Sequence, residues 1–230
     1  MQFSIKLKKN RIDLNKEEGD KELELQKKHS KPKDEDIDDN YAEELALENI
    51  KEGIEGAEEI ITSFSDAIGA LFKTHKEYSM EIAKKMVTDV LPKYFKEDAS
   101  NFEKKMGLFI MDDMVEFLGQ ELLAPIWPDI SKTLITYTDH QSCEIRQAAS
   151  YGLGEFIKHT NADYNKYAED ILKILYKGLE VNSDGAKKDE YAAAQDNIVT
   201  ALGKLIKFRG KEYPNLKEII DFACFSIVSI

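Results

Sequence analysis

Three carboxylates near the middle of the chain have the types and spacing that could do chemistry. Asp112, Asp113 and Glu116 fall within about one helical turn, as a general acid/base pair or a set of metal ligands does. No His or Cys stands at ligand spacing from them, and the sequence contains no Ser–His–Asp, P-loop or zinc pattern. We therefore expect no enzyme, no cofactor and no metal. The three side chains form either a solvated or capping cluster or an acidic contact for a basic partner.

Trp127 and Asn197 are the other single candidates for contact with a partner. Trp127 stands between two prolines and fits either a plug between helices or a platform for a ligand. Asn197, on an otherwise apolar helix, either clamps a backbone group or binds a peptide through its amide. For both residues we favour the structural interpretation over contact with a partner.

Helices must position these side chains, because the chain has only five prolines and its β-branched residues are scattered. The segment 144–159, EIRQAASYGLGEFIKH, shows the spacing of one helical face, and the first half of that face consists of small residues. Small residues let a neighbouring backbone come close, so this helix is expected to be packed on both flanks. Gly152 and Gly154 are interpreted as packing residues, since a dinucleotide fingerprint would need a third glycine and a preceding strand.

Composition limits the class of protein further. The chain has 230 residues, of which 42% are apolar and 33% charged, with a net charge of −12. This acidic balance argues against binding to nucleic acid, whose phosphates need clustered Lys and Arg. Two widely separated cysteines, an N-terminus without a signal-peptide core and no long apolar run predict a soluble intracellular protein without membrane insertion.

A repeat organises most of the chain. Residues 1–40 are highly charged and poor in aromatics, and we expect them to form a disordered tail and acidic linker. In the remainder, 151–159 align with 200–208, 49 positions later, and 104–117 align with 146–159, 42 positions later. A third alignment places 66–72 over 151–157, 85 positions later, or about two repeats. Helical pairs that recur about every 40–47 residues are typical of HEAT and armadillo repeats.

The predicted fold is all-α, a right-handed α-α superhelix of four helical pairs across 41–230. These pairs span about 57–97, 100–138, 142–180 and 187–228. Gly152, Gly154 and Gly203 are expected to lie at contacts between repeats. Arg146 is interpreted as a structural bridge to an acidic group of an adjacent repeat. The spacing from Asp139 to Arg146 is one residue longer than usual, so a ladder between these two residues is expected to be looser.

Specific motifs resemble the importin-beta family of nuclear transport receptors, in particular its importin beta-3 or importin-5 branch. They are Asp112, Asp113 and Glu116; the segment RQAASYGLG at 146–154; and Asn197, Ala201, Gly203 and Lys204. In that branch such segments occur in this order and at near-identical distances. The resemblance covers about residues 25–217. Because members of the family are several times longer, the chain looks like a piece of the C-terminal third.

This resemblance implies a nuclear import receptor, or a fragment of one, that acts as a monomer in the cytoplasm, the nucleus and the nuclear pore. Its expected partners are cargo proteins with basic localisation signals, the GTPase Ran and Phe-Gly nucleoporins. The alternative is a HEAT-repeat scaffold that holds other proteins together without a Ran cycle. Periodicity alone would indicate only such a protein-binding scaffold.

Overall fold

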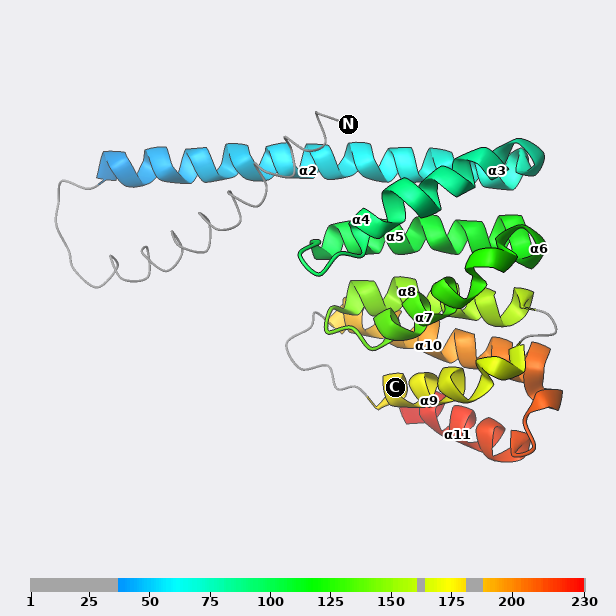
Figure 1. The fold of residues 1–230 in the computed structure, drawn as a ribbon. Helices are drawn as coiled ribbons and strands as arrows, with labels where there is room; N and C mark the ends of the chain where they lie inside the picture. Colours follow the sequence, from blue (N-terminus) through cyan, green and yellow to red (C-terminus); the bar gives the residue numbers. More distant parts are fainter. Residues whose placement is uncertain (1–36, 161–163, 181–187, 230) are drawn as a thin grey trace. The chain divides into compact units, whose positions relative to one another are not determined.

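The computed structural model describes residues 37–160, 164–180 and 188–229 (Figure 1). Within these ranges every regular element is a helix and none is a strand, which confirms the predicted all-α fold class. The predicted disordered tail lies outside the described residues, apart from its last few positions, which belong to a helix. The chain divides into two compact units, Met1–Thr62 and Ser63–Ile230.

The helix α2 (Ile37–Thr74) is the first described element and supplies all of the first unit that the structure describes. It begins well before residue 57, where the sequence placed the first helical pair. Two glycines inside it, Gly53 and Gly56, have open space where a side chain would be. A glycine inside a helix costs only about 1 kcal/mol relative to alanine. The helix tolerates this cost and continues through both glycines.

The second unit contains the last turns of α2 and all later elements. The first helical pair consists of the last turns of α2 together with α3 (Lys76–Lys85), the π-helical η1 (Met86–Val90) and α4 (Leu91–Tyr94). The second consists of α5 (Asn101–Asp113), η2 (Met114–Leu118), α6 (Gly119–Leu123), η3 (Ala124–Ile126) and α7 (Trp127–Thr138). The third has α8 (Cys143–His159), η4 (Tyr164–Lys166) and α9 (Ala168–Leu179). The fourth has α10 (Lys188–Arg209), η5 (Gly210–Glu212) and α11 (Leu216–Ser229).

Local sequence signals fix where the site-bearing helices begin and end. Ser100 and Glu103 form a capping box that satisfies free N–H groups at the start of α5. Prolines stand in the first turns of α4 and α7, where a missing N–H costs nothing. Gly119 has a φ of 76° and separates the π-helical η2 from α6.

Stacking of the pairs builds one continuous core in the second unit. One row of contacts joins α5 to α8 and α8 to α10, and a second row joins α7 to α9 (Figure 1). Side chains from every pair contribute to the core, with Phe72, Leu108, Phe156, Ile171 and Leu205 fully buried.

None of the described helices combines the length and apolar character that crossing a bilayer requires.

Candidate functional site

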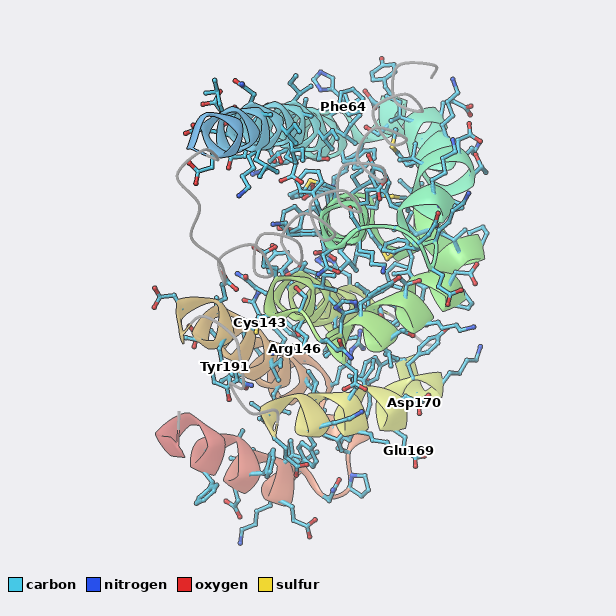
Figure 2. All side chains as sticks on the ribbon, turned by 90° about the vertical axis from the view of Figure 1, so that its left-hand side faces the viewer. Phe64, Cys143, Arg146, Glu169, Asp170 and Tyr191 are labelled. Atoms are coloured by element: carbon cyan, nitrogen blue, oxygen red, sulfur yellow. The ribbon has the colours of Figure 1, made fainter. Side chains whose placement is uncertain are left out.

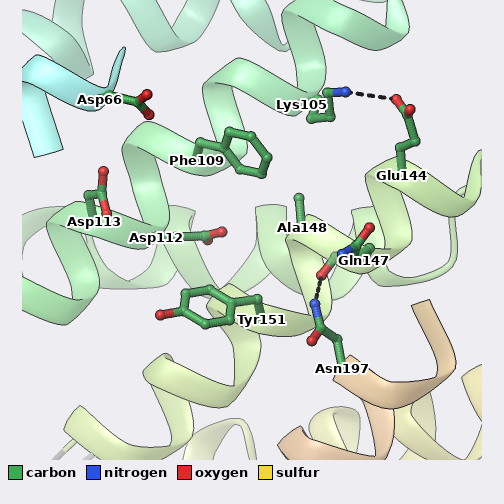
Figure 3. A pocket seen from close by; sticks show the side chains of 10 residues that line it. All are labelled: Asp66, Lys105, Phe109, Asp112, Asp113, Glu144, Gln147, Ala148, Tyr151 and Asn197. Atoms are coloured by element: carbon green, nitrogen blue, oxygen red, sulfur yellow. Dashed lines mark hydrogen bonds and ion pairs between the residues drawn. The ribbon is translucent and has the colours of Figure 1, made fainter. Parts of the chain in front are cut away.

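A groove in the second unit brings together several of the candidate residues (Figure 3). Its volume is about 400 Å³, and α5 and α8 form most of it, with single residues from α2 and α10. We call it the Asp112 groove. It is lined by Asp66, Lys105, Phe109, Asp112, Asp113, Glu144, Gln147, Ala148, Tyr151 and Asn197. Asn197, which was identified separately in the sequence, thus lies in the same groove as Asp112 and Asp113.

Seven lining residues were missed by the sequence interpretation, and for three of them the repeat itself contains the signal. The alignment at 42 positions places Phe109 over Tyr151, and the alignment at 85 positions places Asp66 over Tyr151. The three side chains therefore occupy equivalent positions on successive helices and line one groove. The two rings remain partly open to solvent, with Phe109 38% and Tyr151 40% exposed.

The two aspartates at the end of α5 are wedged against glycines on opposite sides. Asp112 is only 3% exposed, and a Cβ on Gly152 of α8 would overlap its Oδ1. A Cβ on Gly69 of α2 would likewise overlap the carboxylate of Asp113. Both helices therefore need glycine for the carboxyl groups to fit. The Oδ1 atom of Asp112 is buried and has no hydrogen-bond partner.

Burial and like charge raise the pKa of both aspartates. Burial is the largest cause for Asp112, and the carboxylates of Asp113, Glu155 and Glu116 add to it, so its pKa lies well above the ordinary value. Burial, followed by Glu116 and Asp66, raises the pKa of Asp113 to about 6. The Asp112 groove therefore holds carboxyl groups that retain protons more strongly than free aspartate does.

The charged residues at the edge of the groove are already paired. Lys105 donates to Glu144 at 2.9 Å, which joins α5 to α8. The hydroxyl of Tyr151 donates to Glu116 at 2.8 Å, so Glu116 lies beside the groove, although it does not line it. Among the described residues that line the groove, Lys105 is the one cation, and it is paired with a lining carboxylate.

The opposite side of α8 is held by polar groups of α10. The amide of Asn197 donates to the backbone oxygen of Gln147 at 2.9 Å, which is the backbone clamp favoured from the sequence, while the residue also lines the groove. Lys204 donates to the buried Glu155 at 2.6 Å and lies over the ring of Tyr151, 5.2 Å from its centroid. Arg209 donates to the backbone oxygen of Ile157 at 2.8 Å.

The three glycines expected at contacts between repeats have different surroundings. Gly152 lies against Asp112, as described above. A Cβ on Gly154 would come within 3.1 Å of the Lys204 side chain and 3.4 Å of the Ala201 Cα. Gly203 is exposed, with nothing within 4 Å of its missing side chain, so the expected close contact is absent there.

Trp127 is not available to a partner, and its place among the candidate contact residues is corrected. It is 2% exposed and stacks on Phe156 with ring centroids 4.8 Å apart. Trp127 is the first residue of α7, and its ring packs against α8. This arrangement is the plug between helices that the sequence favoured.

The expected bridge from Arg146 to an acidic group of an adjacent repeat is corrected. Arg146 is buried at the beginning of α8, next to Cys143 (Figure 2), and donates to the backbone oxygens of His140 and Gln141 and to the sulfur of Cys143. It thereby ties α8 to the connection between the second and third pairs. Asp139, which was expected at a contact between repeats, pairs with Lys177 of α9 in the next pair.

In the part of the chain that the structure describes, no group of three or more His, Cys, Asp or Glu residues is arranged to hold a metal ion.

Stacked helical pairs with a continuous core define a helical-repeat protein. The chain is similar to a curated protein from Dictyostelium discoideum described as a probable importin-5 homolog, with 27% identity over 169 residues. This match confirms the resemblance to the importin-beta family that the motifs predicted. It covers 69% of this chain and 16% of the relative, so the chain spans about a sixth of that protein's length. No protein-family model matches the chain.

One solved structure, described as Kap95p binding to RanGDP, also aligns with the chain. The alignment covers 72% of this chain and 26% of the other at 11% identity, with a TM-score of 0.45. At this level the likeness does not by itself establish a common fold.

Proposed function

We propose that this chain is a binding segment of an importin-beta-type nuclear import receptor, and that the Asp112 groove takes up a lysine-rich segment of an imported protein. The charge of the groove is the observation that carries this proposal. Asp66, Asp112, Asp113 and Glu144 line it, whereas Lys105 is the one lining cation and is paired with Glu144. Complementary charge steers a basic partner towards such a surface and makes binding sensitive to salt.

The stacking of the repeats supports a receptor that changes shape when it binds or releases a partner. Each helical pair contacts only its neighbours, so small rotations between pairs add up along the stack. The groove is built from α5 and α8, which belong to successive pairs. A partner in the groove therefore acts on the rotation between those pairs.

A second, apolar hollow supports an interaction with Phe-Gly nucleoporins. It has a volume of about 230 Å³, and its walls include Leu91, Phe95 and Ile130, with Thr133 at one side. An aromatic side chain of a flexible repeat fits the chemistry of such a hollow. Replacement of Thr133 by Phe would fill the space, and we expect it to abolish binding of a Phe-Gly peptide while leaving lysine-peptide binding unchanged. Equal Phe-Gly binding by this variant would place that contact elsewhere.

The groove is tested with a labelled lysine-rich peptide and a counterpart in which norleucine replaces lysine. We expect only the lysine peptide to bind, and the double variant Asp66→Asn/Asp113→Asn to weaken binding about tenfold. Glu169→Gln/Asp170→Asn on α9 (Figure 2) is the matched control, because it removes two exposed charges away from the groove. A control variant that weakens binding as much as the groove variant would exclude the groove as the site.

The alternative is a scaffold that binds other proteins without a Ran cycle. An import receptor of this type releases its cargo when GTP-bound Ran binds, whereas a scaffold does not respond to GTP. We expect the full-length receptor that contains this chain to bind GTP-loaded Ran in a pull-down. A stable complex with cargo that ignores GTP-loaded Ran would favour the scaffold.

A further inference from the structure

We propose that a lysine ammonium group entering the Asp112 groove expels a proton from the Asp112–Asp113 pair, so that the groove binds its partner in exchange for a proton. This inference rests on the proposed function and adds to it a specific subsite and a form of regulation. The subsite takes a primary ammonium group on an aliphatic stem. Partner binding then depends on pH in a range where lysine itself does not titrate.

The geometry of Asp112 provides the first step. The side chain is nearly completely buried, yet it forms part of the groove wall and its carboxyl group points into the space between Phe109 and Tyr151 (Figure 3). Its Oδ1 atom, which lies against Gly152, has no hydrogen-bond partner among the described residues. A buried polar atom without a partner costs about 1–3 kcal/mol, so the site gains from any donor that reaches the carboxyl group.

The charged neighbours of the pair provide the second step. They come from each helix packed around it: Asp66 on α2, Glu116 on η2, Tyr151 and Glu155 on α8, and Lys204 on α10. Lys204 is the one cation among them, and Glu155 already holds it at 2.6 Å. The pair therefore lacks a free cation among these neighbours, and its carboxyl groups hold protons more strongly than a free aspartate does.

The proton balance of binding follows directly. Burial, together with the neighbouring carboxylates, raises the pKa of both aspartates, to about 6 for Asp113 and well above the ordinary value for Asp112. An ammonium group beside them supplies the missing positive charge and lowers the pKa again. Lysine enters with its own proton, since its ordinary pKa is about 10.4. The carboxyl O–H bond breaks, the proton passes to the solvent, and a carboxylate–ammonium pair remains.

The walls of the groove fit the stem of a lysine. Phe109 and Tyr151 offer partly exposed rings on two sides of the Asp112 carboxyl group (Figure 3). Aliphatic stems pack on such surfaces while their charged end reaches a polar group. A protonated carboxyl group with a purely structural role would need neither an open groove nor exposed rings beside it.

The test is calorimetric titration of the chain with the lysine-rich peptide in two buffers of different ionisation enthalpy at the same pH. We expect a heat difference that corresponds to release of about one proton, and an affinity that rises up to about tenfold per pH unit between about pH 5 and pH 7. Asp112→Asn mimics the protonated form, and we expect it to lose most of this pH dependence. Glu169→Gln/Asp170→Asn should retain both the proton release and the pH dependence.

The possible failures are distinct. If the peptide binds with equal heats in both buffers and with an affinity independent of pH, the proton exchange is wrong while the proposed function survives. If neither peptide binds at any pH, both are wrong. The measurement on the unmodified chain decides the matter even if Asp112→Asn fails to fold.

Discussion

The two flanks of α8 are held by opposite kinds of chemistry. Towards α10, nitrogen donors are matched to acceptors: Asn197 and Arg209 donate to carbonyls of α8, and Lys204 donates to Glu155. Towards α5, a carboxyl group is pressed against a glycine and one of its oxygens has no partner. We call these contacts the α8–α10 joint and the α5–α8 joint.

The difference indicates where the chain is open to a ligand. At the α8–α10 joint the donors of Asn197, Lys204 and Arg209 each have an acceptor on α8, so a partner has little to add to these three contacts. At the α5–α8 joint burial and like charge raise the pKa of both aspartates, and a groove leads to them. An unsatisfied polar site is costly in a purely structural contact and is typical of functional sites.

The largest expected effect compares two glycines of α8. We expect Gly152→Ala to lower the free energy of unfolding by about 3 kcal/mol, because its Cβ would overlap the buried carboxyl group of Asp112 and lie 2.8 Å from Leu134 Cδ2. Gly154→Ala should cost less than about 1 kcal/mol, since its nearest neighbour is the flexible Lys204 side chain at 3.1 Å. Urea denaturation of both variants measures the difference.

Gly203→Ala is the control for helix propensity in this experiment. It gains a methyl group in open space and should stabilise the chain by about 0.5–1 kcal/mol. Equal losses for Gly152→Ala and Gly154→Ala would remove the distinction between the two joints.

The second prediction breaks the α8–α10 joint. Lys204→Met removes the ammonium group but keeps an aliphatic stem, and it leaves Glu155 nearly buried with Lys158 at 3.0 Å as its remaining lysine partner. We expect a loss of about 2 kcal/mol in the free energy of unfolding, the usual cost of removing a hydrogen bond to a buried charge. Lys158→Met is the matched control, and we expect it to cost about 0.5 kcal/mol because that lysine is exposed. Similar losses for the two variants would show that Lys204 has no special role.

The third prediction concerns the pH dependence of stability at the α5–α8 joint. The folded-state pKa of Asp113, about 6, lies above the unfolded value. Folded protein therefore binds the proton more tightly, and this stability is full at low pH and lost as pH rises through about 6. We expect Asp113→Asn to stabilise the chain at pH 7 by about 1 kcal/mol, a value reduced because the side chain is partly exposed, and to have little effect at pH 4.

Urea midpoints of the unmodified chain and of Asp113→Asn across this pH range provide the measurement. The exposed Asp170→Asn should leave the pH profile unchanged. If Asp113→Asn destabilised the chain equally at all pH values, a charged structural role for Asp113 would replace the protonated one.

Periodicity in the sequence predicted which residues of each helix face a neighbour, but not which atoms they meet. The small-residue face of α8 and the repeat at 42 and 49 positions were enough to predict the stacked helices. The close approach at Gly152 also followed, since only glycine fits beside another helix at that point. Cross-helix partners depend on the rotation between pairs, which helical spacing does not contain.

Arg146 and Trp127 illustrate this limit. Arg146 donates to the carbonyls of His140 and Gln141 rather than to an acidic group of an adjacent repeat. Trp127 could not be assigned to core or surface from its flanking prolines alone. The groove, in contrast, could have been found from the sequence, because Asp66, Phe109 and Tyr151 share one position of the repeat.

The smallest effect on stability is expected at the edge of the groove. A variant there tests most directly whether the α5–α8 joint, unlike the α8–α10 joint, is open to a partner. Lys105→Met removes the ion pair with Glu144, which is partly exposed and therefore stabilises by less than about 0.5 kcal/mol. The same change frees a carboxylate that lines the groove and removes a competing cation. We therefore expect near-normal stability but about threefold tighter binding of the lysine-rich peptide at low salt, with the gain lost at high salt.

Lys132→Met, an exposed lysine of α7 outside the groove, is the control and should tighten binding less. Weaker binding by Lys105→Met would mean that Lys105 holds the partner itself, and that the α5–α8 joint does not select for a cation.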